Sequence, residues 1–428
     1  MVVIKSYFLL IFLFVFFTNS KSFSSQILDF ETETFVKSLI SDVINVNKIN
    51  KQINFKIIND NNINAFVDKN NDIYITSGLI ENCDDYVALL LVISHEIGHV
   101  ELNHVKDRIS NLNKTSKIYD ISNLSIIAGS LISNNTEILK GLALSSATVS
   151  AQNINFSKNQ EMEADYYAID TLKKLNLYSD SIKNLLLTIE NELLNKGLTK
   201  DILRISTHPY FEERINIINY SNEFTSSVFD LNKNKKFNFI KAKFIGYNGN
   251  DLGLLNLEDT YRIYANSILN SKKGNLKKSL KDLNSLISNN KNYIFLIETK
   301  ADILFSYGYI NEAIRFYKKV LLHFPDNYYA QIRIFENTQI DKLSMIEKKI
   351  LFNENLNLLS KYYNNKNILQ TYLELSKLTK KNEWVNFLNF WLFKDNDIME
   401  IQKNLENFKK SSDKDLSNLV EIINNHYL

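Results

Sequence analysis

The chain has 428 residues, of which 45% are hydrophobic, so it can bury at least one substantial core and its length suits two or three domains. Its 50 lysines and arginines nearly balance 48 aspartates and glutamates. A net charge of +2 gives no support for a nucleic-acid partner, which would need a concentrated basic face. The single cysteine, Cys83, excludes an intramolecular disulfide and a cysteine-based zinc site.

The first twenty residues have the pattern of a secretory signal. Lys5 precedes an apolar run over residues 7–17, which is short for a transmembrane helix. The small residues Thr18 and Ser20 suit the positions before a cleavage site. We therefore expect a signal peptide over residues 1–20 and a mature protein that works outside the cytoplasm. An uncleaved membrane anchor is the alternative.

The next segments predict a helix, a hairpin and a second helix. Residues 26–60 place apolar side chains such as Phe35 and Leu39 at helical spacing. Residues 64–80, NAFVDKNNDIYITSGLI, carry two short β-rich runs around the polar turn DKNND, which predicts a β-hairpin. Asp84 and Asp85 then open an apolar segment that runs through Val100. Acidic residues favour a helix N-terminus, so this segment is predicted to be a mostly buried helix.

Further helices are expected downstream. Residues 117–150 contain two short apolar stretches with several hydroxyl and amide side chains, which favours packed helices over membrane spans. Residues 157–175, SKNQEMEADYYAIDTLKKL, predict another helix. The segment THPYFEERINII over 207–218 predicts a loop that leads into a helix.

From about residue 235 the sequence becomes helical throughout and contains a repeat. Gly274 and Gly308 stand 34 residues apart, and aligning on them pairs small or apolar positions in the two copies. The pairs are Leu276 with Ile310, Ser279 with Ala313, Leu280 with Ile314, and Leu286 with Val320. This period is that of the tetratricopeptide repeat. We predict such a helical domain over residues 235–428, and an ordinary helical bundle is the alternative.

The segment LVISHEIGHVELNH, residues 91–104, predicts a metal site. His95 and His99 are four residues apart, so a helix places both on one face. Glu96 lies about 100° further round the helix, where it can reach a water at the same ion. Catalytic zinc takes three protein ligands and keeps one position open, so a third ligand is needed elsewhere.

Helical geometry argues against His104 as that third ligand. On a continuing helix it would lie about 500° beyond His99, on another face. We therefore expect His104 to be a surface or packing residue.

Glu161 is the better candidate for the third ligand. Glu161 and Asp165 are four residues apart on the predicted helix and share a face. Glu161 can bind zinc while Asp165 accepts a hydrogen bond from a ligating imidazole. Glu163 falls on a different side. The sequence thus predicts one zinc ion per chain, held by His95, His99 and Glu161.

These segments, in this order, resemble the gluzincin metallopeptidases. They are most similar to the family that includes the eukaryotic prenyl-protein endopeptidase, HtpX and the periplasmic protease BepA. NAF and DIYITSGLI resemble the family's strand pair, SHEIGHVELNH its metal helix, SKNQEMEAD its helix with the third ligand, and THPYFEERI its following element. Lys158 replaces the family's usual arginine, and DKNND replaces a glycine-rich turn.

The resemblance implies the rest of the predicted architecture and activity. The fold class is α+β: a mainly helical peptidase domain with a small β-sheet over residues 26–225, followed by an all-α tetratricopeptide-like solenoid. The activity is that of a periplasmic zinc endopeptidase in envelope protein quality control. Glu96 would take the proton from the attacking water. A latent or inactive protease that acts as a chaperone or interaction protein through its repeats is the alternative.

The resemblance also assigns roles that spacing alone does not give. His208 is placed over the zinc, either as a fourth ligand that holds the enzyme latent or as a catalytic hydrogen-bond donor. Asn64, Phe66 and Arg214 are candidate substrate-binding residues, and the strand Asp72–Thr76 would bind substrate as an added β-strand. The expected partners are unfolded or misassembled proteins and, through the repeats, outer-membrane assembly machinery. Separately from the resemblance, a weak basic tilt in the C-terminal half makes peripheral contact with anionic lipid a minor alternative.

Overall fold

The structure is a computed structural model that describes residues 26–107, 158–178, 180–195, 229–394 and 398–427. The chain divides into two compact units, one ending at Ala265 and the other beginning at Asn266. The predicted signal peptide, the two apolar stretches of residues 117–150, His208 and Arg214 lie outside the described residues.

The first unit contains a small mixed sheet. Its strands are β1 (Asn54–Ile58), β2 (Ala65–Val67) and β3 (Asp72–Thr76), in the order β1-β3-β2. The strand β1 pairs parallel with β3, and β2 pairs antiparallel with β3. The hairpin predicted over residues 64–80 is therefore confirmed. The prediction of helical spacing throughout residues 26–60 is wrong at its end, because β1 follows the helix there.

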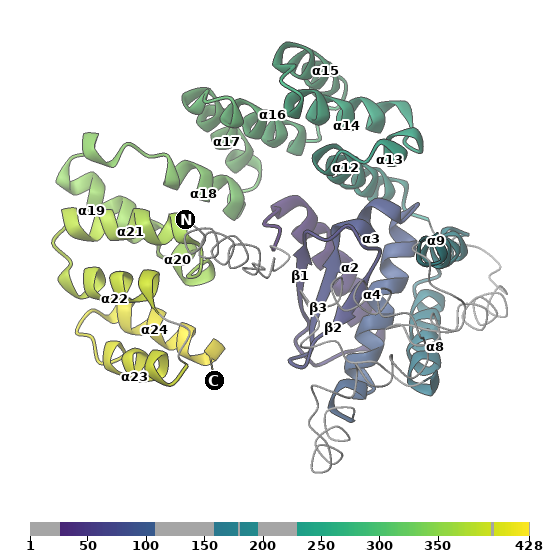
Figure 1. Cartoon of the computed structure of the whole chain (residues 1–428), viewed down its shortest axis with the longest axis horizontal. Helices are drawn as coiled ribbons and strands as arrows, with labels where there is room; N and C mark the ends of the chain where they lie inside the picture. The colour runs from purple at the N-terminus through teal and green to yellow at the C-terminus, as the bar shows by residue number, and fades with distance from the viewer. Residues whose placement is uncertain (1–25, 108–157, 179, 196–228, 395–397, 428) are drawn as a thin grey trace, which may run out of the picture. The chain divides into compact units, whose positions relative to one another are not determined.

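Helices cover this sheet and form most of the first unit (Figure 1). They are α2 (Phe30–Asn47), α3 (Ser77–Asn82), α4 (Tyr86–Glu101), α8 (Lys158–Lys174), α9 (Ser181–Asn195), α12 (Leu231–Asn248), α13 (Asp251–Leu255) and the start of α14 (Asp259–Lys272). The central helix α4 packs on β2 and on α2, α8, α9 and α12. This placement explains why residues 86–93, the first half of the helix, are almost entirely apolar.

Local signals in the sequence set the start of α4. The Asp85 carboxylate accepts hydrogen bonds from the backbone amides of Val87 and Ala88, which have no partner within the helix. Leu, Val and Ile then fill the helix, and 14 of its residues are buried. Cys83, just before this cap, is buried. The prediction of a buried helix from Asp85 to Val100 is confirmed.

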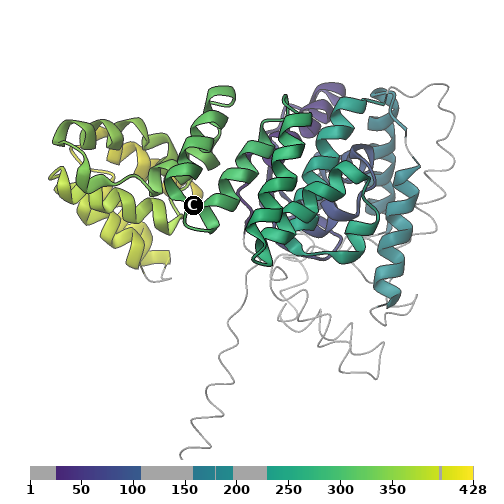
Figure 2. The same cartoon turned by 90° about the horizontal axis from the view of Figure 1, so that it is seen from above.

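The second unit is all-helical within the part of it that the structure describes. After the end of α14 it contains α15 (Leu276–Asn289), α16 (Phe295–Ser306), α17 (Ile310–His323), α18 (Tyr328–Glu336), the short 3-10 helix η2 (Ile340–Lys342), α19 (Met345–Glu354), α20 (Leu356–Lys361), α21 (Lys366–Leu378), α22 (Asn382–Phe393), α23 (Ile398–Phe408) and α24 (Lys414–Tyr427). Figures 1 and 2 show these helices from two sides, and α16 with α17 and α21 with α22 are packed pairs.

The two sequence repeats have the same local structure. The helices α15 and α17 each span 14 residues, begin 34 residues apart and follow a glycine of positive φ, +85° at Gly274 and +81° at Gly308. Side chains at corresponding positions are buried in both: Ser279 with Ala313, Leu283 with Tyr317, and Leu286 with Val320. The shared glycine turn and the shared buried face are the observations on which a repeat assignment depends.

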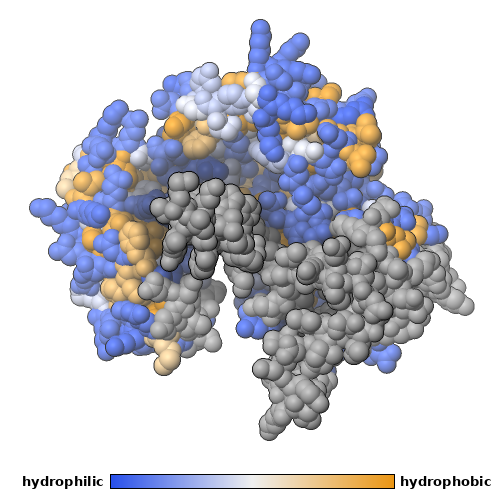
Figure 3. Space-filling view, in the orientation of Figure 1, coloured by the Kyte–Doolittle hydropathy of each residue, from blue (hydrophilic) through white to orange (hydrophobic). Residues whose placement is uncertain are grey.

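Hydrophilic residues cover most of the described surface seen in Figure 3, with apolar residues scattered among them. Among the helices that the structure describes, none is both long and apolar enough to cross a membrane.

Candidate metal centre

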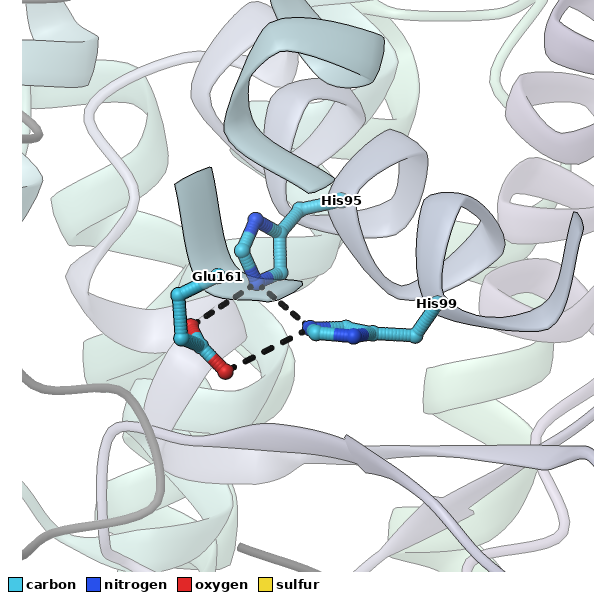
Figure 4. Close-up of side chains that lie close together, drawn as sticks. All are labelled: His95, His99 and Glu161. Carbon is cyan, nitrogen blue, oxygen red and sulfur yellow. Dashed lines mark hydrogen bonds and ion pairs between the residues drawn. The ribbon is translucent and has the colours of Figure 1, made fainter. Parts of the chain in front are cut away.

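The predicted metal ligands meet inside the first unit. His95 and His99 project from one face of α4 toward Glu161, which comes from α8 (Figure 4). The Nε2 atoms of the two histidines are 3.1 Å apart, and each lies 3.5 Å from a carboxylate oxygen of Glu161. All three residues are buried. The four-residue spacing places both histidines on one face of α4, and α8 brings the predicted third ligand to them.

This arrangement fits a tetrahedral zinc ion. Ligand atoms 2.0–2.1 Å from such an ion lie about 3.3 Å from one another, close to the separations found here. Two imidazole nitrogens and a carboxylate oxygen are ligands that zinc accepts. The buried carboxylates of Glu96, Glu161 and Asp165 would also be stabilised by a divalent cation at this point.

Close packing of two helices makes the site possible. A Cβ atom built on Gly98 of α4 would lie 3.2 Å from Cδ1 of Tyr167 and 3.3 Å from Cα of Ala164, both on α8. The small residues at 98 and 164 therefore let α8 approach α4 closely. Glu161 stands about one turn before Ala164, within reach of both histidines.

Asp165 has the predicted contact. Its Oδ1 lies 2.8 Å from Nδ1 of His95, on the side of the ring away from Glu161. A neutral His95 that donates its Nδ1 hydrogen to this carboxylate keeps the lone pair of Nε2 free for a metal. The carboxylate also fixes the orientation of the ring.

His104 is a packing residue, one of the two predicted alternatives, but the structure places it against a metal ligand. It is buried, its Nδ1 lies 3.0 Å from Nδ1 of His99, and its Nε2 lies 3.0 Å from Oε2 of Glu163. The expectation from spacing assumed one continuous helix, but α4 ends at Glu101 and Asn103 has a φ of +60°. Asn is one of the residues that tolerate this conformation after a helix, so Asn103 was the signal that could have revealed the turn.

Glu96 is buried on α4, between the two ligand histidines in sequence. Its side chain is 1% exposed, so it belongs to the interior of the site rather than to the surface of the helix. This burial is compatible with the role of proton acceptor that the sequence predicts.

The candidate substrate residues on the sheet have different environments. Phe66 in β2 is buried and stacks on Tyr74 of β3, with ring centroids 4.9 Å apart. The backbone carbonyl of Asn64 accepts hydrogen bonds from the amide and hydroxyl of Thr76. Both residues therefore support the hairpin. The same hairpin holds β2 against the metal helix α4.

The strand predicted to bind substrate is not an edge strand. β3, residues Asp72–Thr76, pairs with β1 on one side and with β2 on the other, so it cannot add a substrate strand. The prediction is wrong on this point because it did not include β1. At the two ends of β2, backbone hydrogen bonds run to β3: the amide of Thr76 donates to the carbonyl of Asn64, and the amide of Asp68 donates to the carbonyl of Asp72. Since alternate residues face opposite sides, the amides and carbonyls of Ala65 and Val67 point away from β3.

Comparison with known proteins agrees with this site. The model for peptidase family M48 matches residues 31–222, which include both metal-bearing helices. Residues 31–222, somewhat less than half of the chain, therefore match the family M48 peptidase domain. The resemblance to the family of HtpX and BepA is confirmed, and zinc is the metal that this family and this donor set imply.

Three relatives show how far the likeness extends. The putative beta-barrel assembly-enhancing protease of Vibrio cholerae is 27% identical over 176 residues, 40% of this chain and 35% of that protein. The beta-barrel assembly-enhancing protease of Escherichia coli is 24% identical over 208 residues, 48% of this chain and 41% of that protein. Metalloprotease LoiP of Escherichia coli is 33% identical over 129 residues, 30% of this chain and 48% of that protein. The chain thus spans less than half the length of each.

Proposed function

We propose that the chain is a zinc-dependent endopeptidase that cleaves unfolded or misassembled proteins. The observation that carries the proposal is the buried cluster of His95, His99 and Glu161, with Glu96 on the same helix. The family M48 match over residues 31–222 supports it independently. Two relatives are named as proteases that enhance beta-barrel assembly, which supports a role for this chain in protein assembly and hence misassembled proteins as the proposed substrates.

The residues divide the chemistry between them. His95, His99 and Glu161 would hold the zinc, which when bound supplies a Lewis acid and lowers the pKa of water to around 7. The Glu96 carboxylate accepts the proton of the attacking water and returns it to the leaving amine. Asp165 keeps His95 in the tautomer that leaves Nε2 free. His208 and Arg214 stay predictions from the family resemblance.

The β2 edge is the proposed site for the substrate backbone. Ala65 and Val67 direct their peptide groups away from β3, and β2 packs on the metal helix α4. A substrate that adds here as a strand would be held mainly by main-chain hydrogen bonds. Such binding depends little on side chains, which suits an enzyme that acts on many unfolded proteins.

We further propose that the second unit is a tetratricopeptide-like domain that recruits substrates or an assembly partner. The equal lengths of α15 and α17, their 34-residue offset and their glycine turns support it. The apolar run of residues 7–17 supports secretion and a periplasmic location. Outer-membrane assembly machinery and a peripheral membrane contact remain proposed partners.

Removal and return of the metal test the enzymatic proposal. The purified chain should contain about one zinc per molecule and degrade casein. A chelator should abolish degradation, and added zinc should restore it. Degradation that continues with no bound metal would contradict the proposal, as would a purified, folded chain that fails to bind zinc.

A further inference from the structure

A second buried histidine stands behind one of the metal ligands. His104 is 3% exposed, and its ring contacts that of His99 edge to face, with centroids 5.2 Å apart. Its Nδ1 is 3.0 Å from Nδ1 of His99, while its Nε2 is 3.0 Å from Oε2 of Glu163. The side chain of Glu163 is 60% exposed. A line of contacts thus leads from the surface to the metal centre.

The positions of hydrogens along this line follow from the chemistry of imidazole. Nε2 of His99 faces His95 and Glu161, so it must be unprotonated to bind a metal. A neutral His99 then carries its hydrogen on Nδ1 and donates it to Nδ1 of His104. His104, accepting there, carries its own hydrogen on Nε2 and donates it to the Glu163 carboxylate.

We propose that Glu163, acting through His104, fixes the tautomer and the ring orientation of His99 for zinc binding. The two ligand histidines are then oriented by hydrogen-bond chains of different length. His95 contacts Asp165 directly at 2.8 Å, whereas His99 reaches Glu163 through one intervening imidazole. Both His104 and Glu163 are positioning residues. The inference rests on the proposed zinc site.

Both carboxylates that orient the ligand histidines, Asp165 and Glu163, come from α8, and the turn after α4 makes this possible. Asp165 is four residues after Glu161 on α8 and shares its face, but Glu163 lies about 200° round the helix from Glu161. The turn at Leu102 and Asn103 redirects the chain after α4 and brings His104 between His99 and Glu163.

The test is zinc affinity, measured on the full chain by competition with a chromophoric chelator. The variants are Glu163→Ala, His104→Phe, the double variant and His104→Asn. Asp170→Ala is the matched control, because Asp170 is also an exposed acid on α8 and pairs only with Lys174 among the ion pairs described there. Since Glu163 is largely exposed, its substitution should leave the fold intact, which melting of the zinc-free proteins would check.

The proposed line of hydrogen bonds makes distinct predictions for each variant. Loss of a ligand's hydrogen-bond partner weakens metal binding by about 10–100-fold, and we expect this rise in the zinc Kd for His104→Phe. Glu163→Ala should give a smaller rise, within about tenfold, and should add nothing in the His104→Phe background. His104→Asn, which can place a carbonyl oxygen near the Nδ1 position, should recover part of the affinity.

Two outcomes would overturn the inference, and they differ in what else they affect. A wild-type chain that binds zinc, with Glu163→Ala no different from Asp170→Ala, would overturn the role of Glu163 and His104 alone. Effects of Glu163→Ala and His104→Phe that simply add would overturn that role as well. A folded wild-type chain that binds no zinc would overturn the proposed function, and this inference with it.

Discussion

At the scale of single residues, the metal centre concentrates buried negative charge. Glu96 and Glu161 are each 1% exposed and Asp165 is 6% exposed. Burying carboxylates is unfavourable unless opposite charge or hydrogen bonds compensate. A bound divalent cation therefore stabilises the folded first unit as well as serving the reaction, and metal binding and folding should be coupled.

The sequence predicts which residues form this centre better than it predicts the hydrogen bonds that surround them. The spacings of His95 with His99 and of Glu161 with Asp165 each indicate one helix face, and the structure brings all four together. The contact of His104 with His99 was not predictable from spacing, because it depends on where α4 ends. Asn103 carried that information, but only as a weak local preference.

A buried carboxylate away from the metal centre, Glu31, makes stability depend on pH. Burial raises the pKa of Glu31 from 4.5 to about 7, although Lys243, 2.7 Å away and shared with Asp29, acts to lower it. Between about pH 4.5 and pH 7 the folded state holds this proton more tightly than the unfolded state. The free energy of unfolding contributed by Glu31 therefore falls as pH rises through this window.

Calorimetry of wild type and Glu31→Gln isolates this contribution, because other titrating groups cancel in the comparison. The melting temperature of the variant relative to wild type should increase from about pH 5 to about pH 8. A difference that stays constant over this range would show that Glu31 has an ordinary pKa in the folded protein.

At the scale of elements, the packing of α4 against α8 decides the site, and Gly98→Ala tests that packing. Helix propensity alone would make this change stabilising by about 0.5–1 kcal/mol. The new Cβ would instead lie 3.2–3.3 Å from Tyr167 and Ala164, and overpacking costs about 1–3 kcal/mol.

We therefore expect Gly98→Ala to lower both the melting temperature and the zinc affinity, because α8 must move and carry Glu161 with it. The sign of the stability change is decisive. A variant that is more stable than wild type and keeps its zinc affinity would show that the two helices tolerate a wider spacing.

The turn glycines of the repeats allow a second test at this scale. Gly274 and Gly308 have φ values of +85° and +81°, and a Cβ at either would meet nothing within 4 Å. Alanine should therefore cost only backbone strain, about 1–2 kcal/mol and equal at the two positions, and asparagine should cost less. Both tryptophans, Trp384 and Trp391, belong to the second unit, so their fluorescence reports its unfolding. Unequal costs would argue against equivalent repeats.

The β2 edge gives a prediction about substrates. If a peptide adds to β2 as a strand, its alternate amides face that strand. N-methylation along a fluorogenic peptide should then lower kcat/KM at every second residue, by about tenfold for each lost hydrogen bond with a desolvated partner. Exchange of side chains should matter less. Loss at consecutive residues, or at none, would exclude strand addition.

At the scale of the whole molecule, the chain joins a peptidase domain to a helical unit. Composition and periodicity predict the helix-rich fold, the hairpin and the helical second half, and all three are found. The strand β1 was missed because it pairs with the distant strand β3, with Asn54 opposite Asp72, and parallel pairing leaves no local signal.

The central claim is that Glu96 promotes zinc-dependent cleavage by this chain. The most direct measurement is the rate of casein degradation by wild type and Glu96→Gln, with zinc content determined on the same samples. We expect both proteins to bind zinc equally and the variant to be slower by about 10²–10⁴-fold, the range for loss of a general base. Equal rates for the two zinc-loaded proteins would contradict the account. If both are inactive, the result would favour a role as an interaction protein.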